Sequence, residues 1–342
     1  MRPTRILLIG DGRPGHTNLA EGIAAAITRR QPTDITRITV SRGGWPGPVA
    51  ALLTRSTLTP AKLLKIIYGL EARSLPESDI VISAGAETIA ANICAAKHLG
   101  AGNIFYGSLR QYRPLDFSLV LTSYARSARA ANIVQTLKPS ALDPETLPSI
   151  TPDSGNRAIG LLIGGDTGGL SYAPRDWQAL IQLITTIYEE HGVRWHVSNS
   201  RRTPSEATQL LRELAQRTDG PIANFIDVST PKAGSLTDLF AAVDSVVCTA
   251  DSSSMISETI WARRRLVTVA PRRFVLSRNE AAYRNWLAKQ GWCRGLNLAS
   301  LTSSALLEHL RAATPLSSNP LDALAELLSE RLPLARTDDS FA

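Results

Sequence analysis

The 342-residue chain contains few cysteines, no long apolar run and no Asp-x-Asp motif. Its three cysteines, Cys94, Cys248 and Cys293, are odd in number and far apart. This excludes a disulfide framework and a cysteine-based zinc site. No apolar run approaches the roughly 20 residues that a membrane-spanning helix needs, and the apolar stretch after Arg5 is too short for a signal peptide. We therefore expect a globular protein in the cytoplasm.

Acidic residues are scarce in the first half of the chain. Residues 1–150 hold 17 Lys and Arg against 10 Asp and Glu, whereas residues 151–342 hold 20 of each. The whole net charge of +7 therefore lies in the first half. A basic half predicts an anionic partner, which is a phosphorylated ligand, an anionic membrane surface or nucleic acid.

Proline marks the clearest break in the chain. Four prolines lie between Lys138 and Asn156, where neither a helix nor a central strand could continue. On both sides, short apolar runs alternate with longer amphipathic ones, which predicts βαβ units and parallel sheets. The predicted fold class is α/β, with two Rossmann-like doubly wound domains facing a cleft. The expected boundaries are residues 1–140, a linker at 141–156, residues 157–315, and a helical tail at 316–342 that crosses back.

The apolar runs give a coarse set of elements. The predicted strands are Arg5–Ile9, Asp34–Val40, Ile80–Ser83, Asn103–Tyr106, Ser118–Leu121, Ala158–Ile163, Arg194–Val197, Ile222–Phe225, Ser245–Cys248 and Leu266–Val269. The predicted helices are Asn18–Arg30, Glu87–Leu99, Asp176–Glu190, Pro204–Arg217, Leu236–Ala242, Ser253–Arg263 and a stretch from Ser304 to Leu334. Thr203 is expected to cap the helix that starts at Pro204, with Glu206 completing a capping box.

A glycine-rich loop follows the first strand. Gly10, Gly12 and Gly15 form a literal G-x-G-x-x-G between a strand and a helix, the pattern of a dinucleotide site. Pro14 removes one amide from that loop, and Arg42 rather than an acidic residue follows the second strand, which leaves an NADP site as one alternative. A tight turn without function is another. We favour a substrate-facing loop in which His16 is the general base and Asp11 its substitute or orienting group. The loop residues assigned beside them are Gly12, Arg13, Gly15 and Asn18.

Three further loops follow strands of the second half. Because parallel sheets bring such loops to one edge, we expect them to converge on a nucleotide. The expected donor-binding residues are Gly164, Gly165, Asp166, Ser200, Arg201, Arg202, Thr203, Thr249, Asp251, Ser252, Ser253, Ser254, Met255 and Glu258. The paired arginines and the serine-rich helix start suit a diphosphate. Glu258 lies two helical turns after Asp251 and suits the two hydroxyls of a ribose.

The segment Val49–Leu70 mixes leucines and isoleucines with Arg55, Lys62 and Lys65. In a globular domain this pattern is typical of a core helix with a charged outer face. A basic amphipathic surface that touches an anionic bilayer is the alternative.

Four ordered motifs carry a resemblance to a known family. The segments Asp11–Asn18, Leu162–Asp166, Ser200–Pro204 and Thr249–Glu258 resemble the elongated-mitochondria (mitochondrial fission) family of plants and its bacterial relatives. The stretch Asp244–Pro271 also looks like the donor-binding segment of GT-B glycosyltransferases. There the similarity is to the enzyme that adds N-acetylglucosamine to the lipid-linked peptidoglycan precursor, whose first loop also ends in Gly-His.

The resemblance implies a GT-B fold and sugar transfer from a nucleotide-sugar donor to an envelope or lipid-linked acceptor. The first domain would hold the acceptor and would face an anionic membrane surface, and no nucleic acid is expected. GT-B enzymes generally need no divalent metal, so we expect no metal site and no cofactor beyond the nucleotide-sugar as co-substrate. A nucleotide-sugar epimerase of the same fold and a non-catalytic membrane-associated adaptor are the alternatives.

Overall fold

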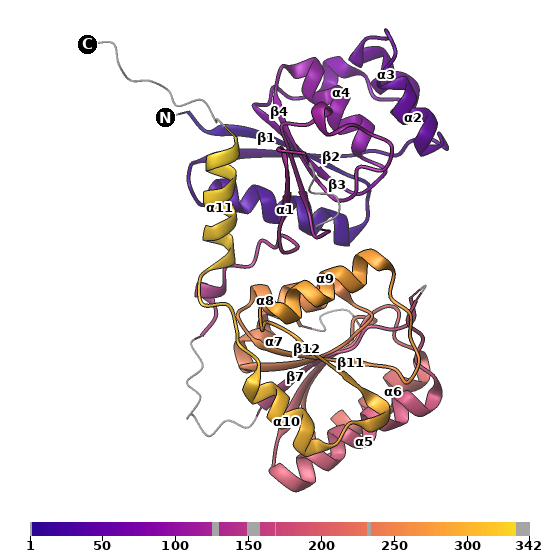
Figure 1. The fold of residues 1–342 in the computed structure, drawn as a ribbon, viewed down its shortest axis with the longest axis vertical. Coiled ribbons are helices and arrows are strands. Elements are labelled where there is room, and N and C mark those ends of the chain that lie inside the picture. Colours follow the sequence, from indigo (N-terminus) through magenta and orange to yellow (C-terminus); the bar gives the residue numbers. More distant parts are fainter. Residues whose placement is uncertain (1, 125–129, 149–157, 168, 231–233, 333–342) are drawn as a thin grey trace, which may run out of the picture. The chain divides into compact units, whose positions relative to one another are not determined.

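The computed structural model describes residues 2–124, 130–148, 158–167, 169–230 and 234–332 (Figure 1). The chain forms two compact units. Unit 1 comprises residues 1–141 and 320–342, and unit 2 comprises residues 142–319. Of the expected linker and tail, residues 149–156 and 333–342 lie outside the described part.

Unit 1 is built on a six-stranded parallel sheet with the order β2-β1-β3-β4-β5-β6. Its strands are β1 (Thr4–Gly10), β2 (Thr33–Thr39), β3 (Ile80–Ala84), β4 (Gly102–Tyr106), β5 (Leu119–Thr122) and β6 (Ile133–Gln135). Its helices are α1 (Pro14–Thr28), α2 (Gly47–Leu53), α3 (Pro60–Tyr68), α4 (Ile89–Leu99) and α11 (Pro320–Arg331). All five residues of β3 are buried, as expected for a central strand covered on both faces.

Unit 2 contains a second six-stranded parallel sheet, with the order β12-β11-β10-β7-β8-β9. Its strands are β7 (Ala158–Leu162), β8 (Arg194–Ser198), β9 (Ile222–Ile226), β10 (Ser245–Thr249), β11 (Arg265–Ala270) and β12 (Arg294–Asn297). Its helices are α5 (Pro174–His191), α6 (Ser205–Ala215), α7 (Leu236–Ala242), α8 (Ser253–Trp261), α9 (Arg278–Lys289) and α10 (Ser303–Ala312). Figure 1 shows helices on both faces of this sheet.

Each sheet has one point at which the chain changes its direction of winding. In unit 1 the first crossover, from β1 to β2, goes one way, and the strands from β3 onward add on the other side of β1. In unit 2, β8 and β9 add on one side of β7, and β10 to β12 add on the other. Ligands of doubly wound sheets bind outside the carboxyl ends of the strands at such a point. The loops after β1 and β3, and those after β7 and β10, are therefore the candidate ligand-binding loops.

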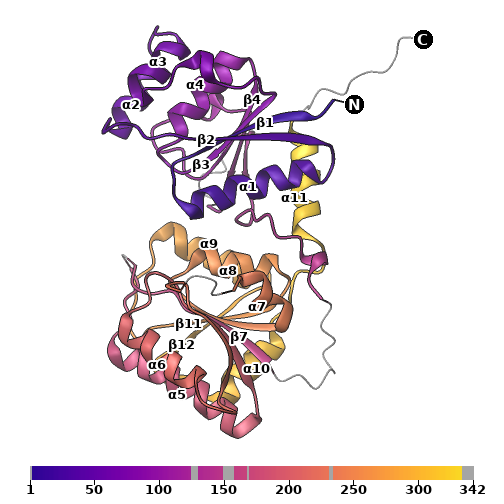
Figure 2. The same ribbon diagram turned by 180° about the vertical axis from the view of Figure 1, so that it is seen from behind.

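The predicted α/β fold class is confirmed, whereas several boundaries differ. Strands β6 and β12 and helix α9 had no prediction, because none of them has a clear apolar period. The tail forms two helices, since Pro315 and Pro320 interrupt the predicted one. The second of them, α11, packs along α1 in unit 1, where Arg29 Nε lies 2.7 Å from an Asp322 carboxylate oxygen (Figure 2).

The predicted capping box at Thr203 is wrong. Helix α6 begins at Ser205 with Pro204 as its N-cap, which makes no side-chain capping bond. The hydroxyl of Thr203 donates instead to the Gly164 carbonyl, at 2.6 Å. A tertiary contact has therefore replaced the local one.

Candidate functional site

In unit 1, the loop after β1 holds a buried carboxylate against an imidazole. The Asp11 side chain is only 2% exposed, and its Oδ2 lies 2.8 Å from Nδ1 of His16, which is 30% exposed. A carboxylate can only accept, so the proton of a neutral imidazole lies on Nδ1 and leaves Nε2 as an acceptor. This is the arrangement that a general base requires. The loop therefore brings both predicted catalytic residues together.

Glycine at two positions makes this arrangement possible. Gly12 has a φ of +76°, which turns the chain sharply after Asp11. Gly85 follows β3, the strand next to β1, and has a φ of +92°. A Cβ atom at Gly85 would overlap the His16 ring. The loops after two neighbouring strands, β1 and β3, thus position the His16 ring at the winding change. Gly85 was not identified from the sequence.

Gly10 and Gly15 of the literal dinucleotide motif are not closely packed in this structure. A Cβ at Gly15 would meet nothing within 4 Å, and one at Gly10 would make only ordinary contacts. Neither glycine is therefore required by close packing, which is the role that the dinucleotide fingerprint gives to its last glycine. Gly15 and the exposed Asn18 lie in the first turns of α1, and Arg13 is the N-cap of that helix.

A second ion pair lies at the same edge of unit 1. Arg42, after β2, is bound by both carboxylate oxygens of Glu87, after β3, and one of these contacts measures 2.9 Å. The hydrogen bond from Arg42 lowers the pKa of the Glu87 carboxyl. The Arg42 guanidinium, which an NADP site would need for the 2′-phosphate, is therefore already neutralised. Glu87 was predicted only as a helix residue.

In unit 2, the loops after β7 and β10 interlock at the winding change. The Gly164 amide donates to the Thr249 hydroxyl at 2.7 Å, and the Gly165 amide donates to Asp251 Oδ2 at 2.9 Å. A Cβ at Gly164 would overlap the Asp251 carboxylate, and one at Gly165 would overlap the Arg202 carbonyl. The two glycines are therefore required by close approach, and the structure brings together the predicted residues of these loops.

Arg202 reaches the same point from the loop after β8. Its Nη1 lies 2.8 Å from Asp251 Oδ2 and also donates to the Gly165 carbonyl at 3.1 Å. Ser200 donates to the Gly164 carbonyl at 3.0 Å. The neighbouring Arg201 is exposed. Both arginines are thus exposed, and Arg202 is in addition engaged within the protein.

The serine-rich segment opens helix α8. Ser252 is the N-cap, and its hydroxyl accepts from the Met255 amide at 3.4 Å. Ser253 Oγ is buried and has no hydrogen-bond partner among the described residues, whereas Ser254 is exposed. Glu258 lies half-buried within the same helix. The segment therefore presents helix amides and a hydroxyl at the sheet edge, with a carboxylate farther along.

Asp166 has a structural task in this unit. Its carboxylate accepts from the Ser171 hydroxyl and from the Tyr172 amide, both at 2.9 Å. The Tyr172 hydroxyl donates to the Val269 carbonyl at 3.0 Å and accepts from the Ala250 amide at 2.9 Å. Burial, with the nearby Asp251 charge as a second cause, raises the pKa of Tyr172 far above its usual value. Asp166 thus shapes the loop that anchors β10 and β11.

The loop after β9 begins with a buried carboxylate that was not predicted. Asp227 binds Asn199 at 3.0 Å and Arg212 at 2.8 Å, and the Ser229 hydroxyl donates to it at 2.8 Å. Burial alone would raise the pKa of the Asp227 carboxyl, but these hydrogen bonds outweigh it and lower the pKa to about 2. The network holds the ends of β8 and β9 in place. A lone Asp after a strand carries no signal of such a network in the sequence.

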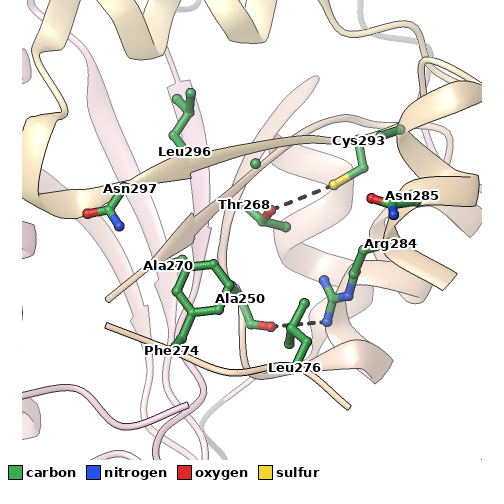
Figure 3. Close-up of a pocket in the computed structure, with 12 residues that line it drawn as sticks. Ala250, Thr268, Ala270, Phe274, Leu276, Arg284, Asn285, Cys293, Leu296 and Asn297 are labelled. Carbon is green, nitrogen blue, oxygen red and sulfur yellow. Dashed lines mark hydrogen bonds between the residues drawn. The ribbon is translucent and has the colours of Figure 1, made fainter. Parts of the chain in front are cut away.

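A pocket of about 300 Å³ adjoins the ends of β10, β11 and β12 (Figure 3). Arg284 of α9 lies at its wall, where it donates to the Ala250 carbonyl at 3.0 Å and to Glu280 at 2.7 Å. The other lining residues are mostly small or apolar and include Thr268, Ala270, Phe274, Leu276, Asn285, Cys293, Leu296 and Asn297. Of the elements that border the pocket, α9 and β12 had no sequence prediction.

The described residues contain neither a cluster of metal ligands nor a membrane-spanning helix. No three His, Cys, Asp or Glu side chains in the described ranges gather closely enough to hold a metal ion. None of the helices that the structure describes combines the length and the apolar character needed to cross a bilayer.

The two-sheet architecture matches that of solved GT-B proteins. The fold resembles a UDP-N-acetylglucosamine 2-epimerase at a TM-score of 0.57, with 14% identity and full coverage of both chains. MurG from Acinetobacter baumannii matches at 0.51 and 13% identity, over 96% of this chain and all of the other. The ADP-heptose LPS heptosyltransferase II of E. coli matches at 0.50 and 16%, over 95% of this chain and all of the other. The chain thus has a two-domain, Rossmann-like GT-B fold.

The family follows from the sequence. The profile described as mitochondrial fission ELM1 matches residues 14–331, so the chain belongs to that family. This confirms the resemblance that the four ordered motifs carry. No functionally curated protein matches the chain significantly.

Proposed function

We propose that this protein is a metal-independent GT-B glycosyltransferase that moves a sugar from a nucleotide-sugar to an envelope or lipid-linked acceptor. The observation that carries the proposal is the pair of winding changes. One holds an imidazole oriented by a buried carboxylate, and the other holds glycine- and serine-rich loops with a helix N-terminus. General bases activate hydroxyl nucleophiles, and helix N-termini bind phosphate.

In this mechanism Asp11 holds the Nδ1 proton of His16, and Nε2 accepts the proton of the acceptor hydroxyl. The acceptor oxygen forms a bond to the anomeric carbon as the bond from that carbon to the phosphate oxygen breaks. The leaving phosphate keeps the electron pair and is stabilised by Arg201 and by the first amides of α8. No cofactor beyond the nucleotide-sugar takes part.

The donor is assigned to unit 2. Glu258 accepts hydrogen bonds from the ribose hydroxyls, and the serine-rich turn holds the phosphate. We assign the sugar to the pocket of about 300 Å³, because its apolar lining with Asn285 and Arg284 suits a sugar ring. Phe274, which is 43% exposed, offers an apolar surface at the pocket.

The acceptor is assigned to unit 1, together with a peripheral association with an anionic membrane surface. On α2 and α3 and in the segments that precede them, the apolar side chains Trp45, Val49, Leu52, Leu58 and Ile66 are exposed, while Leu63, Leu64 and Ile67 of α3 are buried in the core. Leu52 alone is 68% exposed. Lys62 is exposed beside Ile66, so apolar and basic side chains share this surface, as in interfacial helices.

A nucleotide-sugar epimerase is the second candidate. The similarity to UDP-N-acetylglucosamine 2-epimerase, at a TM-score of 0.57, favours it. An epimerase would use the same donor site but would need no acceptor.

Thermal-shift measurements with UDP, GDP, ADP, CMP and NADP test the proposal, because a ligand that binds the folded state raises the melting temperature. A response to one base series supports a nucleotide-sugar enzyme. A response to NADP alone would identify a dehydrogenase, and no response to any nucleotide would favour an adaptor. Conversion of the responding nucleotide-sugar without an added acceptor would separate the epimerase from the transferase.

A further inference from the structure

We propose, on the basis of the function above, that the donor of this chain carries one phosphate group between nucleoside and sugar instead of two. The deciding residue is Asp251. Its carboxylate lies within the loops that would otherwise bind a diphosphate, between the β7 loop and the start of α8.

The Asp251 carboxylate is bound by groups of a kind that bind phosphate in other proteins. Its Oδ2 accepts from the Gly165 amide at 2.9 Å and pairs with Arg202 Nη1 at 2.8 Å, and the side chain has no exposed area. The hollow that the carboxylate fills exists because Gly164 has no side chain. A glycine amide and a guanidinium are the phosphate ligands of glycine-rich loops. The protein therefore supplies its own anion at one of the phosphate positions.

The groups that remain suit one phosphate. In the first turn of α8, the Met255 amide is taken by the Ser252 cap, which leaves the amides of Ser253 and Ser254 without an intrahelical acceptor. Ser253 Oγ has no hydrogen-bond partner in the part of the chain that the structure describes. The exposed Arg201 adds one positive charge. Two amides, one hydroxyl and one guanidinium match the two free oxygens and single charge of a phosphodiester.

A second phosphate would lie beside the Asp251 carboxylate. Like charges brought together in a binding site cost several kcal/mol and act against the wrong ligand. Asp251 Oδ1 is buried as well and accepts no hydrogen bond from any described residue, which leaves its share of the carboxylate charge uncompensated beside that position.

The proposed donor class is therefore a nucleoside monophosphate sugar. This class differs from UDP-N-acetylglucosamine and ADP-heptose, the nucleoside diphosphate sugars that appear in the names of two structures with this fold.

Calorimetry on the full chain tests the phosphate count. We would titrate CMP, UMP, AMP and GMP and the diphosphate of each base. For the base that binds, the monophosphate should bind at least as tightly as the diphosphate. Asp251→Asn should raise the affinity for the diphosphate relative to the monophosphate by roughly tenfold. The matched control is Asp244→Asn, which removes the same charge at the opposite end of β10, where that carboxylate pairs with Arg265 at 3.1 Å, and it should leave the ratio unchanged.

Three results would overturn the proposal. If the wild-type chain binds the diphosphate more tightly than the monophosphate, the phosphate count is wrong and the proposed function stands. If Asp244→Asn shifts the ratio as much as Asp251→Asn does, general charge and not the Asp251 position is responsible. If no nucleotide binds, the proposed function fails and this inference fails with it. Should Asp251→Asn not fold, as judged by circular dichroism, the wild-type ratio decides alone.

Discussion

The two units differ in the side chains that they place at equivalent points of their sheets. Unit 1 has its winding change between β1 and β3 and places an imidazole next to a buried carboxylate there. Unit 2 has its change between β7 and β10 and places glycines, serines and a buried aspartate there. Unit 1 also carries 19 basic and 13 acidic residues, against 18 and 17 in unit 2. The architecture thus provides two similar edges, and residue type alone distinguishes the edge proposed for proton transfer from the edge proposed for phosphate binding.

Of the changes that test this difference between the two units, the substitution of His16 should have the largest effect. His16→Ala should lower turnover by about 10²–10⁴, the usual contribution of a general base, and leave nucleotide affinity nearly unchanged. The pH–rate profile should also lose the limb that reports protonation of the base, because that group is removed. Paired calorimetry and rate measurements check this. If Asp11 were the base instead, His16→Ala would keep the pH limb and Asp11→Asn would remove it.

The complementary change in unit 2 is Glu258→Ala. It should weaken nucleotide binding by about 1.5–3 kcal/mol, the range for a hydrogen bond to a charged group. Calorimetry with a ribonucleotide and its 2′-deoxy analogue checks the assigned contact, because the variant should no longer distinguish the two. Equal affinity of the wild type and the variant would remove Glu258 from the site.

Gly85→Ala sharpens the account of how unit 1 seats its imidazole. The methyl group would overlap His16 and impose strain at a φ of +92°, so we expect a loss of about 1–3 kcal/mol in unfolding free energy. Turnover should also fall, since the ring must move. The matched control is Gly100→Ala, where φ is +64° and no atom lies within 4 Å of the added methyl group. If both variants lose equal stability and activity, backbone strain explains the whole effect.

The Asp227 network should make unit 2 sensitive to acid. The folded-state pKa of about 2 lies below the ordinary carboxyl value of 3.8. Its stabilisation is therefore complete above about pH 4 and is lost as the pH falls through 2. Urea unfolding should show that Asp227→Asn removes roughly 1–2 kcal/mol of this pH-dependent stability. Asp34→Asn, an exposed carboxylate on β2, serves as the control and should leave the pH dependence intact.

The smallest effect concerns the basic surface of unit 1. Lys62→Ala should weaken binding to anionic vesicles by roughly 1 kcal/mol, and rising salt should weaken it further. Substituting Arg55 or Lys65 should weaken vesicle binding less, because Arg55 donates a hydrogen bond to the Gln111 carbonyl and Lys65 pairs with Glu71. Flotation that shows no association at low salt would leave α2 and α3 without a membrane role.

Much of the candidate site was readable from local sequence. The glycine- and serine-rich loops each follow an apolar run, so strand periodicity and loop composition together placed Gly165 after a strand, Ser252 at the start of a helix and Glu258 within that helix. The pairing of Asp11 with His16 is also local, because the two residues lie only five positions apart. Helix α9 escaped prediction because only Tyr283 and Leu287 of its residues are buried. The pocket that it borders was therefore missed too.

The sequence by itself determined the alternation of strands and helices, because apolar spacing is a local property of the chain. It also determined which loops are rich in glycine and serine. Only the tertiary structure decided which of those loops meet, because the order of strands in a parallel sheet depends on crossover connections that no local pattern encodes. The contacts of Gly85 with His16, of Glu87 with Arg42, and of Asp251 with Gly165 and Arg202 all follow from that order.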